Sequence, residues 1–190
     1  AAFGHSEITS HNVTISGAGN LGIMIGNMIN KISPDTNLTY IEVDKDIARN
    51  AAEQLEFASI ISGDTLDPEI IKEARVTNES SFIAATNHDE VNILSSLLTK
   101  RSGTRHNIVL LNQPAFLPLV NTLDLEAVIS PPLITVSSVL KYIRKGQIEA
   151  VHSIIEEFGE VISVEALETS SIIGIPLKET RLPKNVSIGS

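Results

Sequence analysis

The sequence contains no cysteine and no tryptophan, and no apolar run in it is long enough to cross a membrane. Without cysteine, disulfides and thiolate metal sites are excluded. The five histidines show neither an HxxxH nor an HExxH spacing, so we expect no metal site. No charged-then-apolar leader opens the chain. We therefore expect a cytosolic protein that does not insert directly into a membrane.

Positive charge is also scarce, because 14 lysines and arginines face 23 aspartates and glutamates and leave a net charge of −9. Binding to nucleic acid needs clustered cations that contact the phosphate backbone, so this balance argues against nucleic acid. It argues equally against attachment to anionic lipid. A basic cluster does occur from Lys100 to His106, and cations that complement a helix C-terminus explain it.

The sequence does contain an alternation of apolar strand-like runs with helical segments. Hydrophobic residues make up 42% of the 190 residues, which is enough for a sizeable core. Several of the runs are almost continuously apolar, as in a parallel sheet covered on both faces. We therefore predict a doubly wound, Rossmann-like α/β domain of about six strands over residues 10–146. The six runs are NVTIS (12–16), LTYIEV (38–43), ASIIS (58–62), SSFIAAT (80–86), NIVLLN (107–112) and LEAVIS (125–130).

Capping residues predict where several helices begin and end. Asp67 and Pro68 suit the N-cap and the first residue of a helix. Asn87, with Glu90 three residues later, is typical of a capping box at the start of another helix. The last helix of the domain is expected to end near Gly146.

The pattern changes after residue 146. The run AVHSIIEEFGEVISVEALE indicates a β-hairpin around Gly159, and short apolar runs broken by glycine and proline come after it. About 40 residues make a poor domain by themselves. We expect residues 147–190 to be the truncated start of a small, β-rich α+β domain, and the lack of an initiator methionine agrees with an excised fragment.

The most informative motif is GAGNLG at residues 17–22, directly after the first strand-like run. In GxGxxG the glycines permit a tight turn, close approach to a pyrophosphate and close packing of helix on strand. No lysine or arginine lies in this loop, so backbone N–H groups and the helix dipole would hold the anion. The alternative is a merely structural glycine turn. The predicted phosphate loop comprises Gly17, Gly19, Asn20, Leu21 and Gly22.

Such a loop predicts an acid at the end of the next strand, about twenty residues on, that binds the adenosine ribose. Glu42 lies at that distance. Asp44 competes with it, but Asp44 directly precedes a helix and suits an N-cap, so Glu42 is favoured. A carboxylate there repels a 2′-phosphate, which favours NAD over NADP, although it would equally accept the ribose of ATP or ADP.

Other polar residues follow strand-like runs at the carboxyl edge, where ligands bind in open α/β sheets. Asp64 follows the third run and suits either an adenine contact or a turn. Thr86 and Asn87 end the fourth run, near the expected phosphates or second ribose, and capping alone would also explain Asn87. His88 lies near this edge, but a solvent-facing position in a first helical turn is favoured over catalysis.

A catalytic group is not evident, although hydride transfer needs an acid or base beside the cofactor. Neither Tyr40 nor Tyr142 is followed by lysine at the fourth position, so a Tyr-x-x-x-Lys pair is absent. We expect no catalytic residues and no enzymatic activity. The alternatives are the cofactor domain of an NAD-dependent oxidoreductase and a scaffold that binds no nucleotide.

Several segments together resemble the TrkA family of potassium-uptake regulatory proteins. The most specific are TNHDEVN (86–92) and ISP (129–131); the others are GAGNLG, YIEVD, SGDTLDPEII and GIPLKETRLP. The resemblance covers about residues 12–190. It implies an RCK or KTN nucleotide-binding domain, with the start of a C-terminal domain after it.

The resemblance also implies a function. Members are cytosolic regulatory subunits that bind NAD or NADH, and in some cases ATP or ADP. They assemble as dimers and tetramers beneath a membrane potassium transporter of Trk or Ktr type, at the inner face of the plasma membrane. Nucleotide-dependent conformational change would gate that transporter, and no reaction is implied.

Residue by residue, the resemblance assigns the ribose to Glu42 and the adenine side to Gly63 and Asp64. Thr86, Asn87 and Asp89 would lie toward the phosphates and the distal ribose. The helix at 134–145 matches a crossover helix that packs against a partner subunit, although its apolar stripe also suits simple core.

This sequence departs from the family pattern in two respects. Members usually carry two such units in tandem, whereas this chain matches one, which we expect to be the second. The sequence SPP also stands at 130–132, where many relatives have SPR or SPQ. We therefore assign to Pro132 none of the contacts that the arginine or glutamine makes in those relatives.

Overall fold

The computed structural model describes residues 12–123, 125–143, 148–154, 159–164, 173–174 and 176. The chain divides into two compact units, residues 1–134 and 135–190. The predicted domain limit at residue 146 and the helix end at Gly146 lie outside the described residues, so the domain limits stay a prediction.

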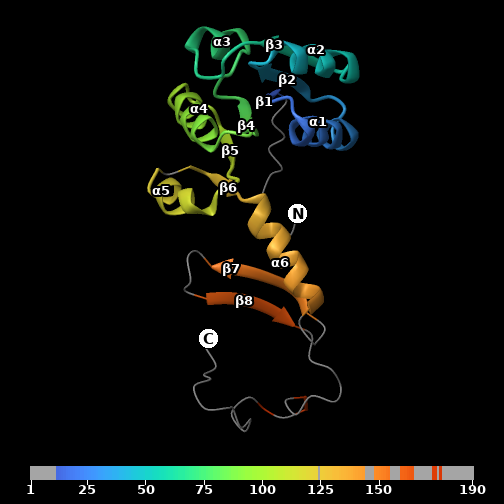
Figure 1. Ribbon diagram of the computed structural model, residues 1–190, viewed down its shortest axis with the longest axis vertical. Coiled ribbons are helices and arrows are strands. Elements are labelled where there is room, and N and C mark those ends of the chain that lie inside the picture. The colour runs from blue at the N-terminus through green and yellow to red at the C-terminus, as the bar shows by residue number, and fades with distance from the viewer. Residues whose placement is uncertain are drawn as a thin grey trace. The chain divides into compact units, whose positions relative to one another are not determined.

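The first unit alternates strands with helices, as Figure 1 shows, and α6 continues from it into the second unit. In chain order the elements are β1 (Asn12–Ser16), α1 (Asn20–Ile32), β2 (Asn37–Glu42), α2 (Lys45–Gln54), β3 (Ala58–Ser62), α3 (Pro68–Glu73), β4 (Ser80–Ala84), α4 (Asp89–Arg101), β5 (His106–Leu110), the 3-10 helix η1 (Pro114–Phe116), α5 (Leu117–Asn121), β6 (Ala127–Ile129) and α6 (Pro131–Ile143).

The six strands form one parallel sheet in the order β3-β2-β1-β4-β5-β6. The chain order reverses between β1 and β4, which is where ligands bind in this type of sheet. At that point Ser16 of β1 is in register with Ile41 of β2 and Ala84 of β4. The predicted doubly wound, Rossmann-like fold is confirmed.

Alternate strand residues pack on opposite faces of the sheet, and helices cover both. On one face Ile15 and Tyr40 pack with Ala51 of α2 and with the apolar side of α1. On the other face two clusters form, one with Ile41 and α3, the other with Val109, α4 and α5. Figure 1 shows α1 and α2 on one side of the strands and α3 and α4 on the other. Strands buried on both faces explain the almost continuous apolar runs.

Two of the predicted helix starts are as the sequence indicated. Asp67 is the N-cap of α3 and accepts a hydrogen bond from Glu69 N (2.9 Å), with Pro68 as the first helical residue. Asp44 is the N-cap of α2 and accepts from Asp46 N (2.9 Å). Both caps are local interactions, because each aspartate accepts a hydrogen bond from an N–H only two residues further along the chain.

The predicted capping box at Asn87 is wrong. Helix α4 begins at Asp89, its N-cap is His88, and that residue makes no side-chain cap hydrogen bond. The hydroxyl of Thr86 instead accepts a hydrogen bond from His88 N (3.1 Å), which closes a turn before the helix. A capping box from Asn87 to Glu90 would start the helix at residue 88. Because of this turn, the helix starts one residue later, at Asp89.

Tyr40 is completely buried beneath α1, and its hydroxyl donates a hydrogen bond to the Gly22 carbonyl (3.0 Å). Gly26 of α1 gives it room, since a Cβ at Gly26 would overlap the Tyr40 hydroxyl. Burial raises the pKa of Tyr40 to about 12 from an ordinary value of 10.0. The hydroxyl thus joins β2 to the first turn of α1.

We expect the stability of the chain to fall between pH 10 and about 12 in part through Tyr40. The neutral phenol favours folding fully below its unfolded pKa, and this contribution is lost as the pH rises through the folded pKa. Tyr40→Phe should have an unfolding free energy about 1 kcal/mol below that of the parent chain at neutral pH. Between pH 10 and about 12, the unfolding free energy of the variant should fall less than that of the parent chain. Urea unfolding across this range measures both, and an unchanged alkaline slope in Tyr40→Phe would contradict the prediction.

The second unit contains an antiparallel hairpin of β7 (Ile148–Ile154) and β8 (Gly159–Val164). Val151 is in register with Ile162, and His152 with Val161. The predicted hairpin around Gly159 is confirmed, while most of the chain beyond residue 164 lies outside the described residues. None of the helices in the described part of the chain combines the length and apolar character needed to cross a membrane.

Candidate nucleotide-binding cleft

A cleft of about 420 Å³ lies at the carboxyl edge of the sheet, within the first unit. Ligand pockets in proteins are commonly of this size, and this edge is where the fold type binds ligands. The turns after β1, β2, β3 and β4 all reach it. Its lining residues are Gly17, Gly19, Ile41, Glu42, Val43, Asp44, Ile47, Asp64, Thr65, Leu66, Ala85, Thr86, Asn87, His88 and Val91.

The three glycines of the GAGNLG loop occupy three different environments. Gly17 has a φ of 100°, and a Cβ there would lie 2.9 Å from the Ala85 carbonyl oxygen. Around Gly19 no atom of the described residues lies within 4 Å of a Cβ position, so this residue leaves open space at the cleft. Gly22 is buried in α1, and a Cβ there would overlap the Gly17 carbonyl oxygen. Turn, ligand approach and helix packing are the roles that this motif requires.

The N-terminus of α1 is suited to an anion. Gly19 is its N-cap and provides no side-chain hydrogen bond, so the first N–H groups of the helix have no side-chain cap. The first turn of α1 contains no acid, whereas α2, α3 and α4 each carry at least one there. A phosphate would therefore meet unscreened N–H groups and the positive end of the helix dipole. Asn20, Leu21 and Gly22 belong to this helix and do not line the cleft.

Glu42 ends β2 beside the phosphate loop and is 9% exposed. One carboxylate oxygen accepts a hydrogen bond from Ala18 N (2.8 Å), and the other accepts from Asp44 N (3.0 Å). Each oxygen retains a lone pair that could accept from a ribose hydroxyl. Asp44 also lines the cleft, but one of its oxygens accepts from both Asp46 N and Ile47 N as the cap of α2. Glu42 is thus the better placed of the two acids.

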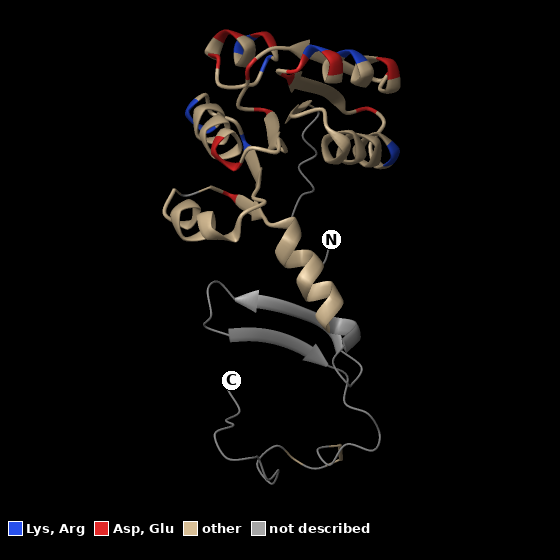
Figure 2. Ribbon diagram, viewed as in Figure 1, with Lys and Arg blue, Asp and Glu red and all other residues tan. Residues whose placement is uncertain are grey.

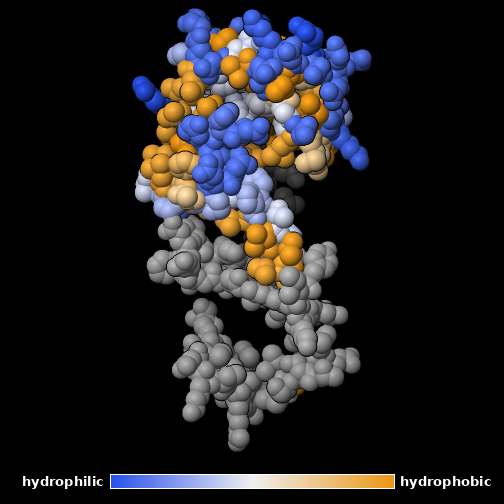
Figure 3. All heavy atoms as spheres, viewed as in Figure 1, coloured by the Kyte–Doolittle hydropathy of each residue, from blue (hydrophilic) through white to orange (hydrophobic). Residues whose placement is uncertain are grey.

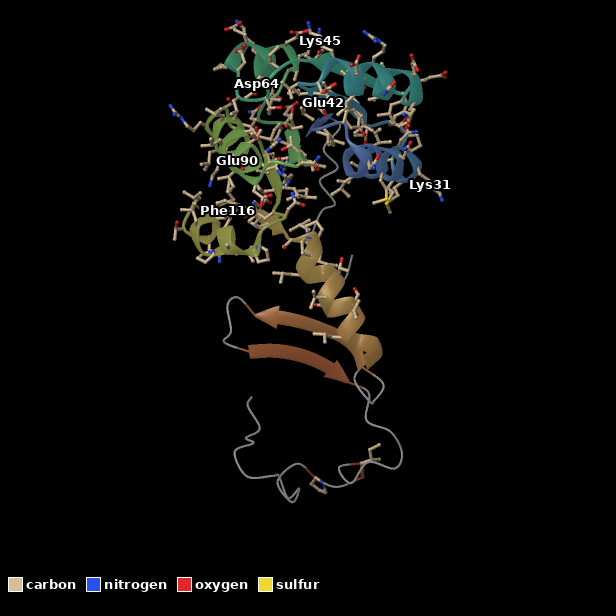
Figure 4. All side chains as sticks on the ribbon, in the orientation of Figure 1. Lys31, Glu42, Lys45, Asp64, Glu90 and Phe116 are labelled. Carbon is tan, nitrogen blue, oxygen red and sulfur yellow. The ribbon has the colours of Figure 1, made fainter. Side chains whose placement is uncertain are left out.

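Asp64 and Gly63 follow β3 on the same edge, and Figure 4 shows Asp64 near Glu42. Asp64 lines the cleft while accepting from Leu66 N (2.9 Å), so it is a turn residue as well as a cleft residue. Gly63 does not line the cleft; its N–H donates to the Glu42 carbonyl (2.9 Å). Gly63 therefore holds the turn against β2.

Thr86 and Asn87, with His88, line the cleft from the turn after β4. Asp89 does not line it. The Asp89 carboxylate is buried and accepts from Asn112 N (2.8 Å) and Gln113 N (2.7 Å), which follow β5. The side chain thereby fastens the start of α4 to the neighbouring strand end and does not face the cleft.

Several cleft residues were not singled out from the sequence. Thr65 is buried, and its hydroxyl is hydrogen-bonded to that of Ser16 (2.7 Å), which joins the turn after β3 to the end of β1. Apolar side chains add a rim that suits a flat base. Val43 and Ile47 lie within five residues of the favoured acid, and this closeness along the chain is the signal that could have found them; the structure shows both to be exposed. The unpredicted lining residues are Ile41, Val43, Ile47, Thr65, Leu66, Ala85 and Val91.

The charge of the cleft lining is negative. Glu42, Asp44 and Asp64 contribute carboxylates, and no lysine or arginine is among the described lining residues. Figure 2 shows that lysines and arginines instead alternate with acids along α2 and α3 and end α4. Within the described part of the chain, no group of three or more histidines or acids gathers in a position to hold a metal. The lining suits a ligand that donates hydrogen bonds from hydroxyl groups.

A larger hollow of about 880 Å³ lies over α4, but its described lining lacks converging polar groups. Leucines dominate this lining, with two cations from the end of the helix. Ligand sites usually combine an apolar wall with a few placed polar groups. The cleft at the sheet edge is therefore the better candidate for a nucleotide. The hollow is lined by Leu66, Leu94, Leu97, Leu98, Lys100, Arg101 and Leu123.

Comparison with known proteins gives relatives over almost the whole chain. A family model described as the TrkA-N domain matches residues 13–131. A Trk system potassium uptake protein TrkA from Azorhizobium caulinodans is 38% identical over 188 residues, which are 99% of this chain and 41% of that protein. A protein of the same name from Vibrio alginolyticus is 30% identical over 181 residues, 94% of this chain and 39% of that one. The chain thus spans about two fifths of the length of these curated relatives.

Solved structures share the fold. The TrkA-N domain of the inner membrane protein ybaL from Escherichia coli has a TM-score of 0.60 at 13% identity, covering 70% of this chain and 97% of that one. A GsuK channel bound to NAD has a TM-score of 0.58 at 20% identity, covering 81% of this chain and 27% of that one. At these identities the likeness concerns the fold alone. Because the TrkA-N model matches more than half of the sequence and the sheet has the fold of a solved TrkA-N domain, the chain belongs to the TrkA-N family.

Proposed function

We propose that this chain binds NAD or NADH as the nucleotide-sensing part of a potassium-uptake regulatory protein and carries out no reaction itself. The observation that carries the proposal is the position of the Glu42 carboxylate, 2.8 Å from Ala18 N and beside the uncapped N-terminus of α1. An acceptor for ribose hydroxyls and a set of donors for phosphate thus lie next to each other.

The remaining lining residues fit the parts of a nucleotide. Val43, Ile47 and Leu66 offer apolar surface to a base near the acid end of the cleft. The open space at Gly19 leaves room for a pyrophosphate at the start of α1. ADP and ATP share the adenosine and phosphate groups with NAD, so the same contacts would hold them. We propose these as the alternative ligands.

The cleft favours a free 2′-hydroxyl over a 2′-phosphate. Glu42 would face that position, and no lysine or arginine of the described lining could neutralise an added phosphate. Placing a dianion against a carboxylate in a partly buried cleft is unfavourable. We therefore propose that NADP binds more weakly than NAD.

A sensing role agrees with the side chains at the cleft. The titratable groups that line it are three carboxylates and His88, whose side chain is largely exposed and lies 3.7 Å from Glu90. Glu42 is the one buried acid among the described lining residues; it accepts hydrogen bonds from Ala18 N and Asp44 N and is the proposed ribose acceptor. An oxidoreductase would need an acid or base beside the nicotinamide.

Coupling to potassium uptake is proposed from the relatives. Proteins named for the Trk potassium uptake system match this chain, and GsuK channels bound to NAD and to ADP share its fold. We propose a membrane potassium transporter of Trk or Ktr type as the partner, at the inner face of the plasma membrane. Nucleotide would act by binding one arrangement of the assembly more tightly than another.

Self-association as a dimer or tetramer is part of the same proposal. Figure 3 shows apolar residues gathered on the described part of α6, where Val136 and Val139 share one face, Ile134 lies on another, and all three are more than half exposed. A helix with an exposed apolar stripe is suited to pack against another subunit. The pairing of two such helices would let a change in one domain alter the angle between the two.

The test is a ligand panel on the purified chain. NAD, NADH, ADP and ATP should each raise the unfolding free energy, by about 2.7 kcal/mol at a hundred times the dissociation constant, and NADP should raise it less at equal concentration. Thermal shift and isothermal titration calorimetry measure this. A chain that none of the five nucleotides stabilises would be a scaffold, and steady oxidation of NADH by the full-length protein with a substrate would make it an oxidoreductase.

A further inference from the structure

A buried amide lies directly behind the cleft, near the start of α4. Asn92 is completely buried, and it does not line the cleft. Its carbonyl oxygen accepts hydrogen bonds from Thr86 N (2.9 Å) and from the Thr86 hydroxyl (2.7 Å). Its amide nitrogen donates to the Thr86 carbonyl (3.0 Å) and to the Leu110 carbonyl (3.0 Å). Both donors and both lone pairs of this side chain are used, as burial of an amide requires.

These bonds determine what Thr86 can offer to a ligand. A hydroxyl has one proton and two acceptor sites. The proton of Thr86 points to Asn92 at 2.7 Å, with a longer contact to the His88 carbonyl (3.2 Å). One acceptor site takes the His88 N–H (3.1 Å), which leaves one site free. Toward the cleft, the Thr86 hydroxyl can therefore accept a hydrogen bond but cannot donate one.

The free acceptor site selects the chemistry of its partner. A phosphate oxygen needs a donor, and both the N–H and the hydroxyl proton of Thr86 are already committed to Asn92. A sugar hydroxyl can donate and therefore fits. Thr86 is thus suited to a ribose and unsuited to a phosphate.

The sheet topology indicates which ribose this is. Glu42 and Asp64 lie at the ends of β2 and β3, on one side of the switch point between β1 and β4. Thr86 follows β4, on the other side. The two halves of this fold each take one mononucleotide, so a ligand with its first ribose at Glu42 would bring its second ribose toward Thr86. ADP has no second ribose.

We propose that Asn92 is a positioning residue that holds Thr86 as the hydrogen-bond acceptor for the second ribose of a bound dinucleotide. The inference rests on the proposed nucleotide-binding function and adds how the site tells a dinucleotide from ADP. The junction is stiff, because Asn92 also reaches the Leu110 carbonyl on β5, and Asp89 holds the N–H groups of Asn112 and Gln113 just beyond that strand.

The test compares affinities for NAD and ADP in Asn92→Leu, which replaces the amide by an apolar side chain of similar size. We expect the variant to bind NAD about tenfold more weakly, since one hydrogen bond to the ligand is lost, and to bind ADP as the parent chain does. Calorimetric titration measures both. An equal loss for the two ligands would mean that Asn92 acts only on overall structure, and would overturn the proposal.

Thr99→Val is the matched control. Thr99 is also completely buried on α4, and its hydroxyl is hydrogen-bonded to the Asn107 side chain (2.8 Å), away from the cleft lining. Because a buried hydrogen bond is lost, Thr99→Val should lower the unfolding free energy. The ratio of the NAD affinity to the ADP affinity should stay that of the parent chain. A changed ratio in Thr99→Val would show that general loosening of α4 suffices, and would overturn the proposal.

Thr86→Val provides a second route if Asn92→Leu does not fold. It keeps the two backbone bonds to Asn92 and removes only the hydroxyl. We expect the same NAD-specific loss, and no further loss on combining the two substitutions. If the parent chain binds both ligands and Thr86→Val binds NAD equally well, this inference fails while the proposed function stands. If the parent chain binds neither ligand, the proposed function fails.

Discussion

Gly22→Ala is expected to destabilise the first unit by about 3 kcal/mol or more, at the upper end of what overpacking usually costs. The added Cβ would overlap the Gly17 carbonyl oxygen. Neither group can move easily, because Gly17 has a φ of 100° and donates a hydrogen bond to the Ile41 carbonyl (2.9 Å). Relief would require α1 to move away from β1 and thereby open the main apolar cluster.

Gly19→Ala in the same loop is the control. A Cβ there meets no atom of the described residues within 4 Å, and the φ of −72° is one that alanine adopts readily. Its unfolding free energy should match that of the parent chain, while nucleotide binding weakens because the methyl group fills space at the cleft. Urea unfolding of the three chains measures the first effect. Equal stability of Gly22→Ala and the parent chain would contradict the packing argument.

Glu42→Gln is expected to weaken NAD binding by about 10- to 100-fold, since hydrogen bonds to a charged group are worth about 1.5–3 kcal/mol. The substitution keeps the size of the side chain and one oxygen for the Ala18 N–H. It removes the charge that would accept from the ribose hydroxyls and repel a 2′-phosphate. The affinity for NADP should fall much less than the affinity for NAD, so the ratio of the NAD affinity to the NADP affinity should decrease. Calorimetric titration with NAD and NADP measures both changes.

Asp46→Asn separates this contact from long-range electrostatics. Asp46 is an exposed acid at the start of α2 and does not line the cleft, so its loss changes the net charge equally. We expect its NAD affinity to stay near that of the parent chain. If Asp46→Asn weakened NAD binding as much as Glu42→Gln, or if Glu42→Gln bound NAD unchanged, the assignment of the ribose to Glu42 would be withdrawn.

Spacing along the sequence was enough to predict that Glu42 would lie beside the GAGNLG turn. The loop, the helix from Asn20 to Ile32 and the acid at Glu42 belong to one strand-turn-helix-strand stretch. The structure brings the Glu42 carboxylate within hydrogen-bond distance of Ala18 N in that turn. The apolar pattern of α1 was less informative about burial. Ile25 and Ile29 pack on the core, whereas Met24, Met28 and Ile32 of the same stripe are exposed, because the sheet covers only part of that face.

By itself, the sequence determined the order of strands and helices, the fold class and the glycine turn, because these depend on periodicity and on contacts between near neighbours. Only the tertiary structure decided which polar groups face the cleft. Asp89 is hydrogen-bonded to residues 23 and 24 positions away and does not line the cleft, and Asn92 is hydrogen-bonded to Leu110, 18 positions away. A buried polar side chain must satisfy its hydrogen bonds wherever the sheet brings partners to it, and the order of the strands in space determines those partners.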